Sequence, residues 1–269
     1  MADPARRLRR AFQLLWLSIR LGALNALQYR VEFVLQLVQS SIALGTALAG
    51  LALVFSHTDN LAGWRPDELL ALVGVFQLVA GLVGLVIRPS MEQLMEGVRL
   101  GTLDFTLTKP ADAQLLVSVR RVNVWRIIDV LVGAGLILFA VARIGERVGP
   151  AGAASFVLVL LAGMAIIYSF LLTLSTLSFW LVRLENILVI YASMYEAGRW
   201  PVGIYPIWLR IALTFVVPVA FAITVPVEAL VGRLEPIGLV GALALAAAFL
   251  IASRLFWRFG LRHYTGASA

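Results

Sequence analysis

Apolar residues run through the chain in blocks long enough to cross a lipid bilayer as helices. A crossing needs about 20 predominantly apolar residues. Five blocks meet this length, at approximately residues 32–55, 69–87, 124–145, 152–182 and 236–257. The pattern therefore predicts an all-α protein that passes through a membrane several times and forms a single membrane domain over residues 1–269.

The stretch between the fourth and the last of these blocks is less regular. Glu196 and Arg199 interrupt it, and four prolines remove backbone donors from it, namely Pro201, Pro206, Pro218 and Pro226. Both ends of the chain are basic, so the positive-inside rule places both termini in the cytoplasm and requires an even number of crossings. We therefore predict six transmembrane helices, with residues 184–200 as the fifth and residues 201–232 as a broken, re-entrant hairpin in the outer leaflet.

The first 30 residues combine arginines with apolar residues at helical spacing. Arg6, Arg7, Arg9 and Arg10 precede or flank Leu8, Phe12, Leu15 and Ile19. This pattern predicts an amphipathic helix over residues 1–30 on the cytoplasmic face. A simple basic anchor for the first crossing is the alternative.

The composition agrees with a membrane protein. Hydrophobic residues make up 61% of the 269 residues and charged residues 14%, against about 25% charged in soluble domains. The net charge of +7 comes from 22 basic and 15 acidic residues, and 16 of the 22 basic residues fall in the predicted cytoplasmic segments. This asymmetry accounts for the charge without nucleic-acid binding and predicts contact with lipid head groups.

The chain lacks the residues that several kinds of chemistry require. The chain has no cysteine, its two histidines, His57 and His263, lie far apart, and its one lysine, Lys109, precedes Pro110 and so fits no phosphate-binding loop. We therefore expect no catalytic residues, no metal site and no ATPase activity in this chain.

The predicted cytoplasmic loop over residues 88–121 is much longer than a connection requires. Its centre reads GTLDFTLTKP, in which Leu103, Phe105 and Leu107 are apolar and Asp104 and Lys109 are charged. Apolar side chains on such a loop indicate a surface that docks onto another protein. A helix at head-group level without a partner is the alternative.

Two segments of the chain resemble the ABC-2 type permeases. They are GTLDFTLTKP at residues 101–110 and the proline-rich stretch EAGRWPVGIYPIWLR at residues 196–210, with the later Pro218 and Pro226. The chain is similar above all to a bacterial branch whose members pair with a separate ATPase and often with a second, related permease. The order of elements resembles the family over nearly the whole chain.

This resemblance implies the type V exporter fold, a location in the bacterial plasma membrane, and two ATPase subunits that bind ATP and Mg beneath two permeases, identical or homologous. Carried over by position, the residues that contact the ATPase would be Gly101, Thr102, Leu103, Asp104, Phe105, Leu107, Lys109 and Pro110. Residues 201–232 would close the exit. The chain itself would be a non-catalytic subunit that moves substrate from the cytoplasm or inner leaflet outward.

Polar residues inside the predicted crossings are the candidates for lining a cavity, because such groups usually face water or a neighbouring helix. They are Glu32, Gln36, Gln39, Gln77, Ser169, Thr173 and Thr176. The structural alternative is that the hydroxyls bond to their own helix and the amides join helices. Arg126 and Asp129, one turn apart, are expected to pair with each other or to act as a latch to another helix.

Two other functions compete with an exporter. A membrane enzyme acting on lipids or isoprenoids would need clustered acids, but Asp104, Asp112 and Asp129 are scattered. An ion-coupled carrier would relay protons through Glu32, Asp129 and Glu196.

Overall fold

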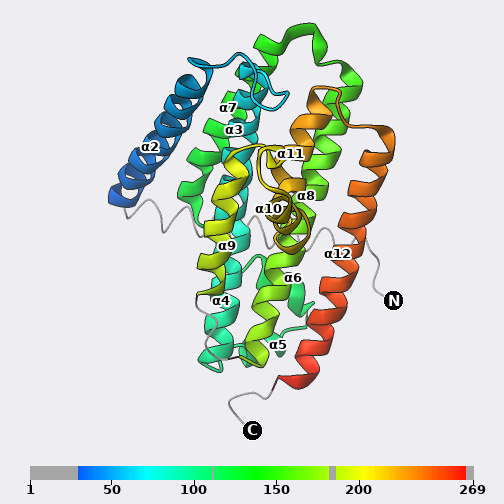
Figure 1. Cartoon of the computed structure of the whole chain (residues 1–269). Helices are drawn as coiled ribbons and strands as arrows, with labels where there is room; N and C mark the ends of the chain where they lie inside the picture. The colour runs from blue at the N-terminus through cyan, green and yellow to red at the C-terminus, as the bar shows by residue number, and fades with distance from the viewer. Residues whose placement is uncertain (1–29, 111, 182–185, 265–269) are drawn as a thin grey trace.

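The computed structural model describes residues 30–110, 112–181 and 186–264, and this part of the chain is helical, without a β-strand (Figure 1). The predicted amphipathic helix over residues 1–30 lies almost entirely outside the described residues. The α-helices are α2 Arg30–Phe55, α3 Pro66–Leu82, α4 Arg88–Arg99, α5 Asp104–Leu107, α6 Ala113–Ser118, α7 Ile127–Ile144, α8 Pro150–Thr176, α9 Ile187–Glu196, α10 Ile207–Ile211, α11 Val219–Leu230 and α12 Pro236–His263. Short 3₁₀ turns are η2 Val124–Arg126, η3 Gly145–Arg147, η4 Leu177–Phe179, η5 Ala197–Arg199 and η6 Val202–Ile204, and two π-helical turns are η1 Val83–Ile87 and η7 Ala212–Val216.

Five helical stretches are long and apolar enough to cross a membrane, in agreement with the five apolar blocks of the sequence. They are Val31–Phe55, Pro66–Arg99, Val124–Ile144, Pro150–Phe179 and Pro236–His263. Three of the long helices begin with proline, at Pro66, Pro150 and Pro236. Proline suits the first position of a helix because its fixed φ is helical and its missing N–H would have no partner there.

The prediction of a crossing over residues 184–200 is wrong as a single helix. Helix α9 has ten residues, Ile187–Glu196, and rises about 15 Å, half of the roughly 30 Å of a bilayer core. A bent helix pair, Ile207–Val216 and Val219–Leu230, meets at 98° and would be the sixth span if it is counted as one. The return from one end of the bundle to the other is therefore divided between α9 and this pair.

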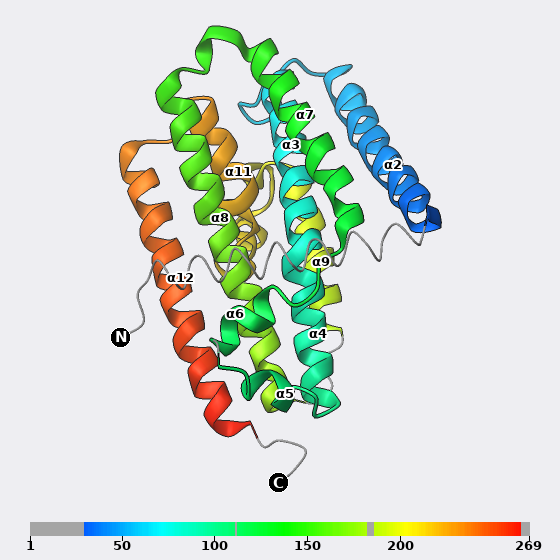
Figure 2. The same cartoon turned by 180° about the vertical axis from the view of Figure 1, so that it is seen from behind.

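The second predicted span also differs from expectation at one end. Helix α3 continues through η1 into α4 without interruption, so residues 88–99 are helical rather than part of a loop. The 34 residues Pro66–Arg99 would reach about 51 Å, well beyond a bilayer core. The lower part of this helix therefore extends past the ends of α2 and α7 and lies, with α5 and α6, beside the lower parts of α8 and α12 (Figure 2).

Helices α3 and α7 pack closely against each other at the centre of one half of the bundle. A side chain at Gly81 would place its Cβ 2.7 Å from the backbone nitrogen of Val130, and one at Gly133 would clash with the backbone of Leu78. Small residues allow helix backbones to approach in this way. The glycines thus fix which faces of α3 and α7 meet.

Helix α8 plays the same part in the other half, where it packs against α11 and α12. A Cβ on Gly163 would lie 2.5 Å from the carbonyl oxygen of Phe221 in α11. Helices α2 and α12 lie at opposite edges of the bundle (Figure 1) and bury few of their side chains. Their apolar outer faces are suited to lipid or to another membrane subunit.

Candidate functional site

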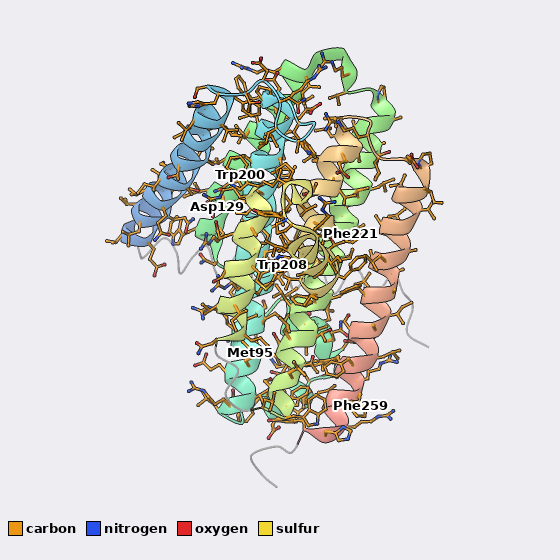
Figure 3. All side chains as sticks on the ribbon, viewed as in Figure 1. Met95, Asp129, Trp200, Trp208, Phe221 and Phe259 are labelled. Atoms are coloured by element: carbon orange, nitrogen blue, oxygen red, sulfur yellow. The ribbon has the colours of Figure 1, made fainter. Side chains whose placement is uncertain are left out.

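A buried carboxylate joins three helices on the α2 side of the bundle (Figure 3). Asp129, in the first turn of α7, is 2% exposed. Its Oδ2 accepts hydrogen bonds from Gln36 Nε2 and Arg126 Nη1, both at 2.9 Å. Its Oδ1 accepts from Gln77 Nε2 at 2.9 Å and from the hydroxyl of Ser40. These five residues are called the Asp129 cluster below.

The cluster satisfies the carboxylate completely and ties α2 and α3 to α7. Two carboxylate oxygens can accept about four hydrogen bonds, and Arg126 supplies the opposite charge that a buried anion requires. The Arg126–Asp129 pair agrees with the expectation from their spacing. The hydrogen bonds from Gln36 and Gln77 also connect Asp129 to helices α2 and α3. A latch between helices, the alternative role of Arg126 and Asp129, requires such contacts.

The predicted polar face of the first span is only partly turned inward. Gln36 is buried, whereas Glu32 and Gln39 are exposed. Ser40, four residues after Gln36, is the residue that shares its buried side, and the sequence reasoning missed it. Its i, i+4 spacing from Gln36 is a signal that could have found it.

The polar residues of α8 do not join the cluster. Thr173 donates to the Ser169 carbonyl at 2.8 Å and Thr176 to the Leu172 carbonyl at 2.7 Å, so both bond to their own helix. The Ser169 hydroxyl is buried without a partner among the described residues. The structure gives these three residues a place in the interior of the bundle, and their role as cavity residues stays a prediction.

The acids invoked for a proton-relaying carrier are not brought together. Asp129 is buried in its cluster, while Glu32 is exposed and Glu196 is exposed and paired with Arg199 at 2.6 Å. Among the described residues, no three His, Asp or Glu side chains gather into a group that could hold a metal ion.

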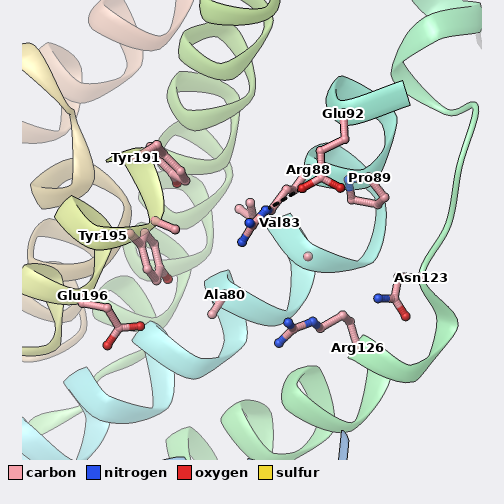
Figure 4. Close-up of a pocket in the computed structure, with 12 residues that line it drawn as sticks. Ala80, Val83, Arg88, Pro89, Glu92, Asn123, Arg126, Tyr191, Tyr195 and Glu196 are labelled. Atoms are coloured by element: carbon pink, nitrogen blue, oxygen red, sulfur yellow. Dashed lines mark hydrogen bonds and ion pairs between the residues drawn. The ribbon is translucent and has the colours of Figure 1, made fainter. Parts of the chain in front are cut away.

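A pocket of about 350 Å³ lies beside the cluster, along the lower part of α3, η1 and α4, with α9 on one side and η2 on the other (Figure 4). It is called the α9 pocket below. Its lining combines small apolar residues with charged and aromatic side chains: Ala80, Val83, Gly84, Arg88, Pro89, Glu92, Asn123, Arg126, Tyr191, Ala192, Tyr195 and Glu196.

The π-helical turn η1 forms one wall of this pocket, and Pro89 explains its geometry. In a regular helix the N–H of residue 89 would bond to the Leu85 carbonyl, but proline has no N–H. The backbone N–H of Asn123 takes this place and donates to Leu85 O at 2.8 Å. The proline therefore opens the helix at the point where η2 docks onto it.

The α9 pocket contains charges of both signs. Arg88 Nε lies 2.9 Å from Glu92 Oε1, and Arg126 also belongs to the Asp129 cluster. Figure 4 shows the guanidinium groups of Arg88 and Arg126 directed toward the middle of the pocket, with Glu196 on the α9 side. Of these pocket residues, the sequence singled out only Arg126, as a partner of Asp129, and Glu196, as a proton-relay acid of the carrier alternative.

The segment over residues 101–110, called the coupling segment below, forms a turn and a single helical turn at the lower end of the bundle. Gly101 opens it with φ +69°, a conformation that glycine adopts without strain. Leu103 and Thr106 are buried, and Phe105 on α5 is 73% exposed. The segment thus presents an aromatic side chain outward from an anchored base.

Side-chain contacts fasten α6, which follows the coupling segment, to the membrane helices α8 and α12. Asp112 caps α6 by accepting from Leu115 N at 3.2 Å and pairs with Arg254 of α12. Arg254 also donates to Gln114 Oε1 at 2.6 Å, and Ser118 Oγ lies 2.7 Å from the Tyr168 hydroxyl of α8. The hydrogen bond from Arg254 holds the pKa of Asp112 below its usual value.

The proline-rich element forms the predicted broken helix. Pro218 lies between η7 and α11 where the two helices bend by 98°, and Pro226 lies inside α11. The protein satisfies part of the irregular backbone, since Arg210 Nη2 donates to Gly203 O at 2.7 Å and the Tyr205 hydroxyl to Ala197 O at 2.8 Å. Pro201 is buried and Pro206 exposed, each directly before a short helix.

Comparison with known proteins gives one result. Residues 41–268 match the family model described as ABC-2 family transporter protein. No curated protein and no solved structure matches the chain significantly. The match covers every element described above except the first turns of α2.

Proposed function

Because the chain belongs to the ABC-2 family of transporter proteins, it is a membrane permease subunit of an ABC transporter, and we propose that a separate ATPase drives it to move substrate outward. The substrate would enter from the cytoplasm or the inner leaflet. ATP and Mg would bind to the ATPase, and this chain would convert the motion of that partner into a change of access across the membrane.

The observation that carries this proposal is the geometry of the coupling segment. Phe105 is strongly exposed, while its neighbours Leu103 and Thr106 are buried in the bundle. A large exposed aromatic side chain on a rigid base is typical of the centre of a protein interface. We propose that Phe105 inserts into the ATPase, with Leu107, which is half-buried against the bundle, beside it and with Gly101, Thr102, Asp104, Lys109 and Pro110 shaping the surrounding surface.

The contacts of α6 supply a route from this surface to the membrane. A force on the coupling segment would reach α12 through Asp112 and Arg254 and would reach α8 through Ser118 and Tyr168. The two helices pack together, and α8 also packs against α11 of the bent outer element. Such paired, rigid elements are what an alternating-access change requires.

The charge distribution supports a cytoplasmic location for the end that carries the coupling segment. Basic residues of segments 88–126 and 254–262 belong to this end, namely Arg88, Arg99, Lys109, Arg120, Arg121, Arg126, Arg254, Arg258 and Arg262. By the positive-inside rule this end faces the cytoplasm of a bacterial plasma membrane, with both termini on that side. The turn around Pro218 would then belong to the exit side of the pathway.

We further propose an assembly of two permeases, identical or homologous, with two ATPase subunits. The support is the large exposed apolar surface of α2 and of α9, where Val34, Val38, Val189 and Ile190 are all exposed.

The test is to purify the chain together with its ATPase and to measure assembly and ATP hydrolysis. Phe105→Ala combined with Leu107→Ala should reduce both at least tenfold, as expected for loss of an interface hot spot of about 2 kcal/mol or more. Leu138→Ala, at a similarly exposed apolar residue on α7, should leave both unchanged. Normal assembly and hydrolysis in the double variant would exclude the proposed coupling surface.

A further inference from the structure

The α9 pocket lies beside the point where the apolar residues of α3 and η1 give way to the charged residues of α4. Residues 69–87 carry no charge, and Arg88 is the first charged residue after Glu68. The pocket wall follows this change, from Ala80 and Val83 to Arg88 and Glu92. If the chain spans a bilayer as its composition indicates, the pocket lies at the level of the lipid head groups.

The charges of the pocket fit neither a simple anion nor a simple cation. Arg88 and Arg126 direct two guanidinium groups into it, and Glu92 and Glu196 add two carboxylates (Figure 4). A simple anion would meet the two carboxylates, and a simple cation would meet the two guanidiniums. A ligand with one group of each sign matches the lining, and guanidinium groups suit phosphate through paired N–H donors.

A buried hydroxyl gives independent evidence for a polar ligand. Tyr191 is 4% exposed, lines the pocket, and its hydroxyl has no hydrogen-bond partner among the described residues. Its neighbour Tyr195 differs, because that hydroxyl donates to Phe76 O at 2.8 Å. Buried polar groups are normally paired, so an unpaired hydroxyl beside a cavity indicates a group that the cavity receives.

From these observations we propose that the α9 pocket binds the head group of a zwitterionic phosphate-bearing amphiphile of the phosphatidylethanolamine class. Arg88, Arg126 and the Tyr191 hydroxyl contact the phosphate, and the ammonium group lies toward Glu196. The volume of about 350 Å³ is within the range of small-molecule sites, about 300–1,000 Å³. The acyl chains leave the pocket into the membrane.

Binding is tested with the purified full-length chain in detergent, by thermal stabilisation with four probes. Short-chain phosphatidylethanolamine should raise the Tm, because a ligand that binds only the folded state stabilises it. Short-chain phosphatidylglycerol should need about fivefold more ligand for the same shift. Short-chain diacylglycerol has acyl chains but no phosphate or ammonium group, and inorganic phosphate has no ammonium group and no acyl chains, so neither should produce a shift.

Two variants assign the effect to the pocket. Arg88→Gln should weaken phosphatidylethanolamine binding about tenfold, because it removes a charged guanidinium from the phosphate, and Tyr191→Phe should weaken it about threefold, because it removes one hydroxyl donor. Arg143→Gln and Tyr205→Phe remove the same groups outside the pocket and should leave binding unchanged. Equal stabilisation by diacylglycerol or by inorganic phosphate, equal affinity for phosphatidylglycerol, or unchanged affinity in Arg88→Gln would each overturn the proposal.

A second experiment identifies the source of the bound molecule, and only this part depends on the proposed function. The chain and its ATPase are placed in liposomes that contain fluorescent phosphatidylethanolamine. ATP-dependent movement of this lipid that Arg88→Gln slows at least threefold identifies transported cargo, whereas binding without movement identifies a resident lipid. Failure of transport thus leaves the detergent result intact, and failure of binding in detergent overturns the site whether or not the chain transports.

Discussion

The side-chain amide of Gln77 lies 2.9 Å from Oδ1 of Asp129, at the same pair of helices that Gly81 and Gly133 bring into close contact. The two features depend on each other. A short polar side chain reaches across a helix pair only where the backbones are near, and a buried carboxylate is stable only where donors reach it. Helix α2 then joins the pair through Gln36 and Ser40.

Removal of the Asp129 carboxylate should destabilise the protein strongly. Asp129→Ala leaves Arg126, the Ser40 hydroxyl and two amides without their acceptor, and each buried donor left unpaired costs about 1–3 kcal/mol. Thermal unfolding in detergent should show a marked fall in Tm. Glu92→Ala, which removes an exposed partner of Arg88, should have an effect of less than about 1 kcal/mol. Similar effects of the two substitutions would contradict the role given to Asp129.

The close approach of α3 and α7 can be tested with two glycines of the same helix. Gly133→Ala would push its methyl group into the backbone of Leu78 and should cost at least about 2 kcal/mol, as overpacking does. Gly135→Ala meets nothing within 4 Å and should be neutral or stabilise by up to about 1 kcal/mol through helix propensity. The Tm of the two variants tests this difference. A Gly133→Ala variant as stable as the native chain would show that α3 and α7 are further apart.

The pair of Asp112 and Arg254 predicts a dependence of stability on pH. The pKa of Asp112 is lowered in the folded protein, so the pair stabilises the fold above the unfolded-state pKa of about 3.9 and loses its effect as the pH falls through the lower, folded-state pKa. The difference in Tm between the native chain and Asp112→Asn should therefore be constant near pH 7 and shrink below about pH 4. Asp59→Asn, at an exposed loop position, should show no such difference. A difference in Tm between the native chain and Asp112→Asn that grows on acidification would contradict this prediction.

The origin of the π-helical turn can be tested at Pro89. In Pro89→Ala a new backbone N–H competes with that of Asn123 for the Leu85 carbonyl. Hydrogen exchange at the Asn123 amide should become at least about tenfold faster, because its partner is shared or lost. Pro66→Ala, at the first turn of α3 where an N–H has no helical partner, should leave this amide unchanged. Unaltered protection in Pro89→Ala would show that another cause holds the turn open.

The membrane spans could be predicted because a bilayer imposes length and apolarity on each helix separately. The predicted block at residues 124–145 and the observed Val124–Ile144 differ by one residue, and Pro236 begins the last helix as expected. The failure at residues 184–200 arose because that crossing was inferred from the need for an even number of spans and not from an apolar block of sufficient length. Charged Glu196 and Arg199 and the following Pro201 end α9 and η5 there, so local chemistry outweighed average hydropathy.

The candidate site was less accessible to prediction because its residues come from separate helices. Gln36 and Asp129 are 93 residues apart, and Gln77 and Asp129 are 52 apart. The pattern identified all three as notable, but only helix packing decides which of them meet. The α9 pocket depends in addition on the effect of Pro89 on the backbone, which no apolar or polar pattern encodes.

The π-helical turn η1 also sets the direction in which the side chains of the following helix, α4, point. Each residue of an α-helix advances the side-chain direction by about 100°, so a turn that holds one extra residue offsets the rotational phase of α4 by that amount. Deletion of a single residue between Val83 and Ile87 would swing Arg88 out of the pocket and carry Phe105 around the bundle axis, while the membrane portion of α3 stayed in place. A length change of one residue is thus enough to redirect the end of the chain for which we propose the ATPase contact, without any substitution in the packed interior.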